Sequence, residues 1–375
     1  MASKALKAPF IRHVASRGYA HAAPALKNEV RLQTAILPSK TFVAALDNGS
    51  PVTRVTVAFK AGCRYEPQTE LGVSHVLRSA AGLTTKNASG FIMARKLAQI
   101  GASVTSSGDR EFVYYTLEAT QDNLQPALEL LNNLVSNQEF RPWELSDNNP
   151  RLQYDIASLS PQVRAVDLLH KAAFRRGLGN SLFISPKRIG KISSESMQHF
   201  AATTVTPSRC AIVIVGGSQE RAALVANTLQ LPTSGDAKEE ATKYYGGELR
   251  KEMGGDLAHI ALAVQGAPAG SPQSFALAVA AKALHAMVQC QSRGGWTFRT
   301  RSLSLRRQLA NALVRSPQLA STCSCTLWYS GLFGVLLSDL HSRTIANAVL
   351  SNAIKSKISM GAAGNLAHVP YVDEL

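Results

Sequence analysis

Apolar and polar residues alternate in the first part of the chain in the manner of β-strands. Residues 54–60 (RVTVAFK) place valines and a phenylalanine at every second position, the pattern of a half-buried strand. The dipeptide Asn48-Gly49 lies just before them and favours a tight turn between two strands. Residues 41–62 are therefore predicted to form a β-hairpin.

Later stretches repeat apolar residues at helical spacing. Residues 121–135 carry them at 124, 127, 128, 131, 134 and 135, which lie on one face of a helix. Ser89 is suited to cap another helix, which Gly101 would end. The residues of that helix predicted to face inward are Phe91, Ala94, Leu97 and Ile100. Further helices are predicted near 71–82, 143–158, 161–175, 194–204 and 218–229.

Two more strand signals and a polar interruption complete the pattern. Residues 102–119 are predicted to form two strands around a Ser-Gly-Asp turn, and 209–217 (RCAIVIVGG) a buried strand that ends at glycines. The polar stretch 232–248 is interpreted as an interdomain linker. A strand signal at 259–266 and a helix signal at 274–288 follow it. Because strands and helices are mixed rather than strictly alternating, an α+β fold is predicted.

The chain of 375 residues has a formal net charge of +15, which raises the question of a nucleic-acid partner. The charge is unevenly distributed. Residues 1–28 contribute +5 and residues 288–327 contribute +6, both without any acid, which leaves +4 for the rest. The body of the protein is therefore nearly balanced, and no nucleic-acid-binding face is predicted.

The N-terminal segment has the composition of a mitochondrial targeting sequence. It is basic, contains serine and alanine, and has no acid before Glu29. It also lacks the apolar core, about 7–15 residues long, of a secretory signal. Residues 1–20 are predicted to be a transit peptide cleaved near Tyr19, and a disordered basic tail is the alternative. The mature structure is expected to begin between residues 20 and 35.

Hydropathy and cysteine spacing argue against a membrane span, a disulfide framework and a zinc finger. No stretch approaches the ~18 uninterrupted apolar residues of a membrane span. Five cysteines at irregular spacing do not form a disulfide framework, and the pair Cys323 and Cys325 has no second pair at zinc-finger spacing. Free thiols in a reducing compartment are predicted. No haem or iron–sulfur cofactor is predicted either, because the corresponding cysteine motifs are absent from the sequence.

The stretch LGVSHVLRSA contains part of a zinc-peptidase motif. In H-x-x-E-H, two imidazoles bind the metal and a carboxylate beside them accepts a proton from bound water. His75, Arg78 and Ser79 would share one helix face at these positions. Arg78, however, is a permanent cation, Ser79 is a poor zinc ligand, and the later helix over 151–157 offers only Asp155. We therefore predict no metal and no catalytic residue here, and a packed role for His75.

Several stretches together resemble the mitochondrial processing peptidase family of two-domain zinc peptidases. AGCRYEPQTELGVSHVL (61–77) is similar to the family's strand, turn and entry into the metal helix, and IGASVTSSGDREFVYYTLEAT (100–120) to the strand pair that follows. YSGLFG (329–334) and SMGAAGNLAHVPYVDEL (359–375) resemble non-catalytic members of the family, the core subunits of ubiquinol–cytochrome c reductase, respiratory complex III. The resemblance also extends over residues 20–287.

This resemblance implies two related α+β domains, each a mixed or antiparallel sheet packed with helices. The expected boundaries are 30–232 for the first domain, 233–250 for the linker and 251–375 for the second domain. Residues 288–327 do not resemble the family and hold six arginines and three of the five cysteines. A shifted reading frame, altered splicing or a gene-model error is one interpretation, and a natural basic loop is the other. The second domain is expected to be incomplete, with an exposed sheet edge.

Two functions are compatible with the resemblance. The first is a non-catalytic structural subunit of complex III on the matrix side of the mitochondrial inner membrane, peripheral to the membrane and without cofactors. Its expected partners are the homologous core protein 1 and other subunits of the complex. The alternative is a zinc-dependent presequence peptidase or its substrate-binding subunit. The first is favoured because the motif is lost, the glycine-rich substrate loop is reduced to 253–256 and 265–270, and the near-neutral body would attract basic presequences poorly.

Overall fold

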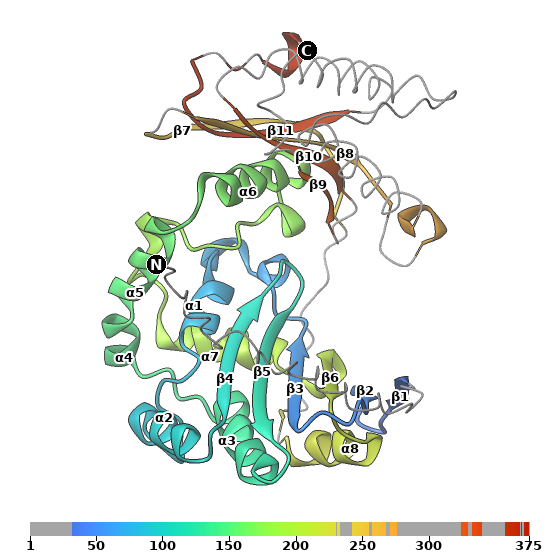
Figure 1. Ribbon diagram of the computed structural model, residues 1–375. Helices are drawn as coiled ribbons and strands as arrows, with labels where there is room; N and C mark the ends of the chain where they lie inside the picture. Colours follow the sequence, from blue (N-terminus) through green and yellow to red (C-terminus); the bar gives the residue numbers. More distant parts are fainter. Residues whose placement is uncertain are drawn as a thin grey trace, which may run out of the picture.

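Helices pack on two mixed β-sheets, which confirms the predicted α+β class (Figure 1). The computed structural model describes residues 32–229, 231–232, 242–254, 257–267, 271–275, 324–328, 332–339, 357–367, 369 and 371–374. The predicted transit peptide, most of the segment 288–327 and the predicted helix at 274–288 beyond residue 275 lie outside the described residues.

The first sheet has the strand order β1-β2-β6-β3-β5-β4. Its strands are β1 (Leu32–Ile36), β2 (Phe42–Leu46), β3 (Val52–Phe59), β4 (Ser103–Gly108), β5 (Val113–Thr120) and β6 (Cys210–Val215). In β3 the alternating residues Val55, Val57 and Phe59 are completely buried, as the period-2 pattern predicts. The antiparallel pair predicted at 102–119 is confirmed as β4 and β5.

The hairpin predicted over 41–62 is wrong. The turn exists, with Gly49 at a φ of +65°, but β2 and β3 do not pair with each other. Instead β6 lies between them, parallel to β2 and antiparallel to β3. The side chains of Ile212 and Ile214 on β6 are completely buried, and a strand gains most from burying such residues in the middle of a sheet.

Most of the predicted helices are confirmed. Those that accompany the first sheet are α1 (Val73–Ser79), α2 (Gly90–Gln99), α3 (Leu124–Ser136), α4 (Pro142–Asp147), α5 (Asn149–Ala157), α7 (Ser194–Thr204) and α8 (Gln219–Thr228). All six apolar positions predicted to face inward on α3 are buried. Short 3-10 turns lie at Cys63–Tyr65, Gln68–Glu70, Gly177–Gly179, Pro186–Arg188, Pro207–Arg209 and Val372–Glu374.

The inward face predicted for α2 is partly wrong. Ser89 does cap the helix, by accepting a hydrogen bond from the backbone N–H of Ile92. However, Phe91 is 77% exposed, Ala94 is exposed as well, and Met93 is the buried residue. Four apolar residues follow one another at 91–94, so periodicity alone does not specify which of them turns inward. The flexible methionine side chain fills the space against the core.

The second sheet has the order β7-β11-β8-β10-β9. Its strands are β7 (Gly247–Glu252), β8 (Ala258–Gln265), β9 (Ser324–Trp328), β10 (Leu332–Asp339) and β11 (Ile358–Gly364). The strand expected at 259–266 is confirmed as β8. β7 begins inside the span expected to be linker, and β9 uses the last residues of the segment 288–327.

Helix α6 (Pro161–Phe174) connects the two halves of the chain. It precedes β6 of the first sheet in sequence, yet it lies across the second sheet, against β11 and β8 (Figure 1). Its residues Ala165, Leu169 and Ala173 are completely buried in a cluster with residues of the second sheet. The second sheet thus forms its core with a helix from the first half of the sequence. Among the described helices, none is long and apolar enough to cross a lipid bilayer.

Candidate functional site

The start of α1 is fixed by a buried carboxylate. Glu66 accepts hydrogen bonds from the backbone N–H groups of Gly72 (2.8 Å) and Ser74 (2.9 Å) and from the Ser74 hydroxyl (2.5 Å). These bonds satisfy N–H groups that a helix start leaves without intrahelical partners. Burial raises the pKa of Glu66, while the hydrogen bonds act in the opposite direction. These hydrogen bonds from Gly72 and Ser74 to Glu66 fix the start of α1. They thereby position the three motif residues His75, Arg78 and Ser79 on the helix.

His75 is buried, and its ring is hydrogen-bonded to the backbone. Its Nδ1 accepts from the N–H of Ile184 at 3.3 Å, and the ring packs edge-on against Phe183 with centroids 5.5 Å apart. A neutral imidazole that accepts at Nδ1 carries its proton on Nε2. That Nε2 lies 3.9 Å from Oδ2 of Asp155, beyond hydrogen-bonding distance. His75 is thus packed against Phe183 and hydrogen-bonded to the backbone of Ile184.

The environment of His75 keeps its ring neutral. Its pKa is lowered to about 4, first by burial and then by the positive charges of Arg78 and Arg151. A site built to hold a divalent cation would show the opposite electrostatics, because acidic ligands surround such ions.

Lowering the pH should expose this perturbation as a loss of stability. The unfolded state takes up a proton near pH 6.5 and the folded state only near pH 4, so stability falls as pH falls through this window. Between pH 7 and pH 5 the contribution of His75 is about 2 kcal/mol. The variant His75→Asn keeps an acceptor near Nδ1 but has no group that titrates here. Between pH 7 and pH 5 we expect its free energy of unfolding, measured with urea, to fall by about 2 kcal/mol less than that of the wild type.

The matched control for this measurement is His199→Asn, at an exposed position on α7. Because this variant still contains His75, the dependence of its stability on pH should match that of the wild type. The pKa of buried His170 is also lowered, to about 3 and mainly by burial, and it contributes equally in all three proteins. Equal loss of stability in His75→Asn and in the wild type would contradict the prediction.

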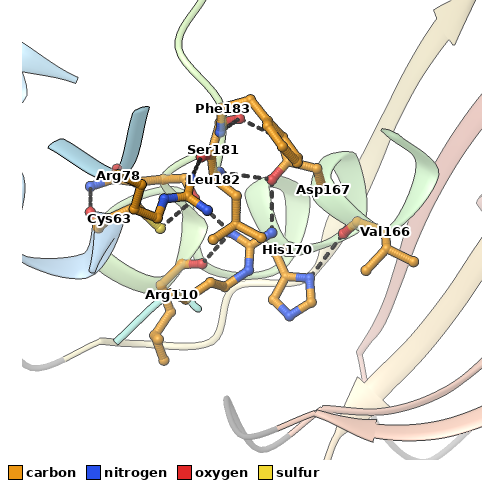
Figure 2. A network of polar contacts seen from close by, with 11 residues as sticks. Cys63, Arg78, Arg110, Val166, Asp167, His170, Ser181, Leu182 and Phe183 are labelled. Carbon is orange, nitrogen blue, oxygen red and sulfur yellow. Dashed lines mark hydrogen bonds and ion pairs between the residues drawn. The ribbon is translucent and has the colours of Figure 1, made fainter. Parts of the chain in front are cut away.

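Arg78 occupies the place of the motif's carboxylate and is hydrogen-bonded to the protein frame. Its Nη2 donates to the carbonyl of Leu182 at 2.6 Å, and its Nε donates to the carbonyl of Ser74 at 3.4 Å (Figure 2). The side chain reaches past Gly108, where a Cβ would lie 2.7 Å from Cδ of Arg78. Arg78 therefore joins α1 to the segment that contains Leu182, instead of activating water.

Ser79 is also engaged by the protein. The amide Nδ2 of Asn148 donates to its hydroxyl at 2.9 Å, and Nη1 of Arg151 donates to its carbonyl at 3.3 Å. The structure thus brings the three motif residues together on α1 and places Asp155 beside His75. Within the described part of the chain, no group of three or more His, Cys, Asp or Glu residues could hold a metal ion.

A second polar cluster, which the sequence did not indicate, lies next to Arg78 (Figure 2). Asp167 of α6 is its centre: Oδ1 lies 2.8 Å from Nη2 of Arg110 and accepts from the N–H of Leu182 at 3.2 Å. Its Oδ2 accepts from the hydroxyl of Ser181 at 2.7 Å. Both Asp167 and Arg110 are largely buried, so these bonds form in a poorly hydrated environment.

Arg110 extends the cluster to the 3-10 turn at Cys63–Tyr65, which follows β3. Its Nη1 donates to the carbonyls of Asn180 (2.5 Å) and Leu178 (3.2 Å). The amide of Asn180 donates in turn to the carbonyl of Cys63 at 2.9 Å. Burial raises the pKa of the Cys63 thiol to about 12, which makes it a packed group and not a nucleophile. The cluster is a structural joint between α6 and the first sheet.

Comparison with known proteins gives a family match and several relatives. The family model described as "Insulinase (Peptidase family M16)" matches residues 42–185, which include the motif positions. The human cytochrome b-c1 complex subunit 2, mitochondrial, is 33% identical over 335 residues, which cover 88% of this chain and 72% of the human protein. The Cryptococcus neoformans protein of the same name is 31% identical, over 82% of this chain and 71% of its own length.

A more distant relative is the mitochondrial-processing peptidase subunit alpha of Solanum tuberosum, 27% identical over 80% of this chain and 62% of its own length. The fold and the family match define the class, a peptidase-like protein of the insulinase type. Within that class, the chain belongs to the family of cytochrome b-c1 complex subunit 2 proteins.

Proposed function

We propose that this protein is a non-catalytic structural subunit of the mitochondrial cytochrome b-c1 complex. The observation that carries the proposal is the hydrogen bond from Arg78 to the carbonyl of Leu182, made where a peptidase of this class needs a free carboxylate. A guanidinium cannot take a proton from water, because it is already protonated at any physiological pH. The face of α1 that would perform catalysis is therefore used to hold the fold together.

The finer parts of the proposal concern place and partners. We place the protein on the matrix side of the inner membrane, without redox cofactors, in contact with the homologous core protein 1 and other subunits. Two findings support this. The relatives named as subunit 2 are mitochondrial proteins of this complex, and the bovine subunit 1 is itself 26% identical over 82% of this chain. Two related chains of this kind can pair through similar surfaces.

The second candidate is a presequence peptidase, or the subunit of one that binds substrate. It is supported by the similarity to a processing-peptidase alpha subunit and by the nearness of His75 to Asp155. Against it stand the proton on Nε2 of His75 and the two arginines that lower the pKa of its ring. Zinc binding would require the repulsion of these cations to be overcome.

Two measurements on the same preparation separate the candidates. The tagged chain is expressed in mitochondria, and its migration is followed by native gel electrophoresis with antibodies against the b-c1 complex. The purified chain is analysed for zinc and incubated with a presequence peptide. We expect co-migration with the complex, loss of assembled complex on depletion, zinc far below one ion per chain, and no cleavage. Stoichiometric zinc, with cleavage abolished in His75→Ala, would establish the peptidase instead.

A further inference from the structure

A cavity of about 350 Å³ lies beside the altered motif. It is bounded by the end of α1, by α2 and by β4, the edge strand of the first sheet. Cavities of roughly this size, from 300 Å³ upward, are typical of small-molecule sites. The hydrogen bond from Arg78 to Leu182 and the ion pair of Asp167 with Arg110 do not explain why this cavity exists.

The polar part of the cavity wall is cationic. Arg78 and Arg151 both line it, and no acidic residue does. Ser106 of β4 also lines it, and the hydroxyl of this serine is buried without a hydrogen-bond partner. Buried hydroxyl groups almost always have a partner, so an unpaired one in a residue of the cavity wall is available to donate to a bound ligand atom. The two arginines in the same wall favour an anionic oxygen.

The remaining wall is largely apolar. Met93 and Leu97 of α2 and Leu134 of α3 contribute to it, together with Val104 of β4. An inorganic anion would leave these side chains facing water, whereas an aliphatic chain would cover them and gain hydrophobic free energy. A ligand that matches both parts of the wall therefore has a carboxylate at one end and a hydrocarbon tail at the other.

We propose that this cavity binds a small aliphatic carboxylate, which contacts Arg78, Arg151 and Ser106 through its oxygens and Met93, Leu97 and Leu134 through its chain. Arg78, which does not suit metal chemistry at this motif position, would thereby serve as part of an anion site. This binding goes beyond the proposed function and does not depend on it, since it requires neither the b-c1 complex nor a partner subunit.

The test is calorimetric titration of the full chain with octanoate below its micelle-forming concentration, with octanol and octylamine as probes of equal chain length. We expect saturable binding of octanoate. Loss of a charge-assisted hydrogen bond should make octanol at least about tenfold weaker. Octylamine should not bind, because it brings a third cation to the two arginines. Equal affinity for octanoate and octanol, or no saturable octanoate binding, would overturn the proposal.

Variants locate the site. Arg151→Met and Ser106→Ala should each weaken octanoate by about tenfold and leave the affinity for octanol unchanged. The matched control is Arg95→Met, at an exposed position of α2 outside the cavity lining. Leu97→Trp, which fills the cavity from its apolar side, should abolish binding of both probes. Circular dichroism confirms that each variant is folded, and wild-type octanoate affinity in folded Arg151→Met would refute the assignment.

Discussion

Gly361→Ala is expected to lower the free energy of unfolding by about 3 kcal/mol or more. A Cβ at this position of β11 would lie 2.3 Å from both the carbonyl oxygen of Ala165 and the backbone nitrogen of Leu169. These are backbone atoms of α6, so no side-chain rotation can relieve the clash and the whole helix must move away from the sheet. The cluster that contains Ala165, Leu169 and Ala173 would then lose its packing.

The measurement is urea unfolding together with hydrogen exchange of α6 and β11. Gly254→Ala is the matched control, since its added Cβ would meet no atom within 4 Å. We expect near-wild-type stability for the control, and faster exchange confined to α6 and the second sheet for Gly361→Ala. If both variants unfold at the same urea concentration, α6 does not pack directly on β11.

The second large effect is expected from Asp167→Ala. This change leaves the guanidinium of Arg110, whose side chain is only 10% exposed, without its carboxylate partner. Breaking a buried pair by removing one partner costs about 3–5 kcal/mol, because the remaining charge stays buried without its counter-ion. Ser181 and Leu182 lose their acceptor at the same time, so the segment that receives the Arg78 hydrogen bond should also loosen.

Glu118→Ala provides the comparison for Asp167→Ala. Glu118 pairs with Arg54 at 2.5 Å on the exposed part of the first sheet, where the two side chains are 41% and 60% exposed. Exposed pairs contribute only about 0–1 kcal/mol. Thermal and urea unfolding of both variants should therefore separate a structural joint from a surface ion pair. A smaller loss for Asp167→Ala than for Glu118→Ala would contradict the role assigned to the cluster.

Local elements were predictable where the sequence repeats clearly. On α3 every predicted inward residue is buried, because thirteen residues at helical spacing leave a single apolar face. On α2 the run of apolar residues at 91–94 allowed two choices, and packing selected Met93 rather than Phe91. Periodicity specifies a face only when polar residues separate the apolar ones.

The candidate site was predictable in its chemistry but not in its contacts. Arg78 and Ser79 are unsuited as base and ligand from their side chains alone, and Asp155, the one acid that the sequence offers over 151–157, lies 3.9 Å from His75. No spacing indicated that Ile184 would donate to His75 or that Leu182 would accept from Arg78. Each of these pairs joins residues more than a hundred positions apart.

By itself the sequence determined which side chains stand on α1, and so which reactions that helix can no longer support. It also determined the α+β class and most of the helices, since these follow from local periodicity. Only the tertiary structure decided that β6 lies between β2 and β3, that α6 packs on the second sheet, and that Asp167 meets Arg110. Local patterns specify which surface of a helix or strand is apolar. Which other element packs on that surface depends on how much apolar area the two bury together, and the two can be far apart in the sequence.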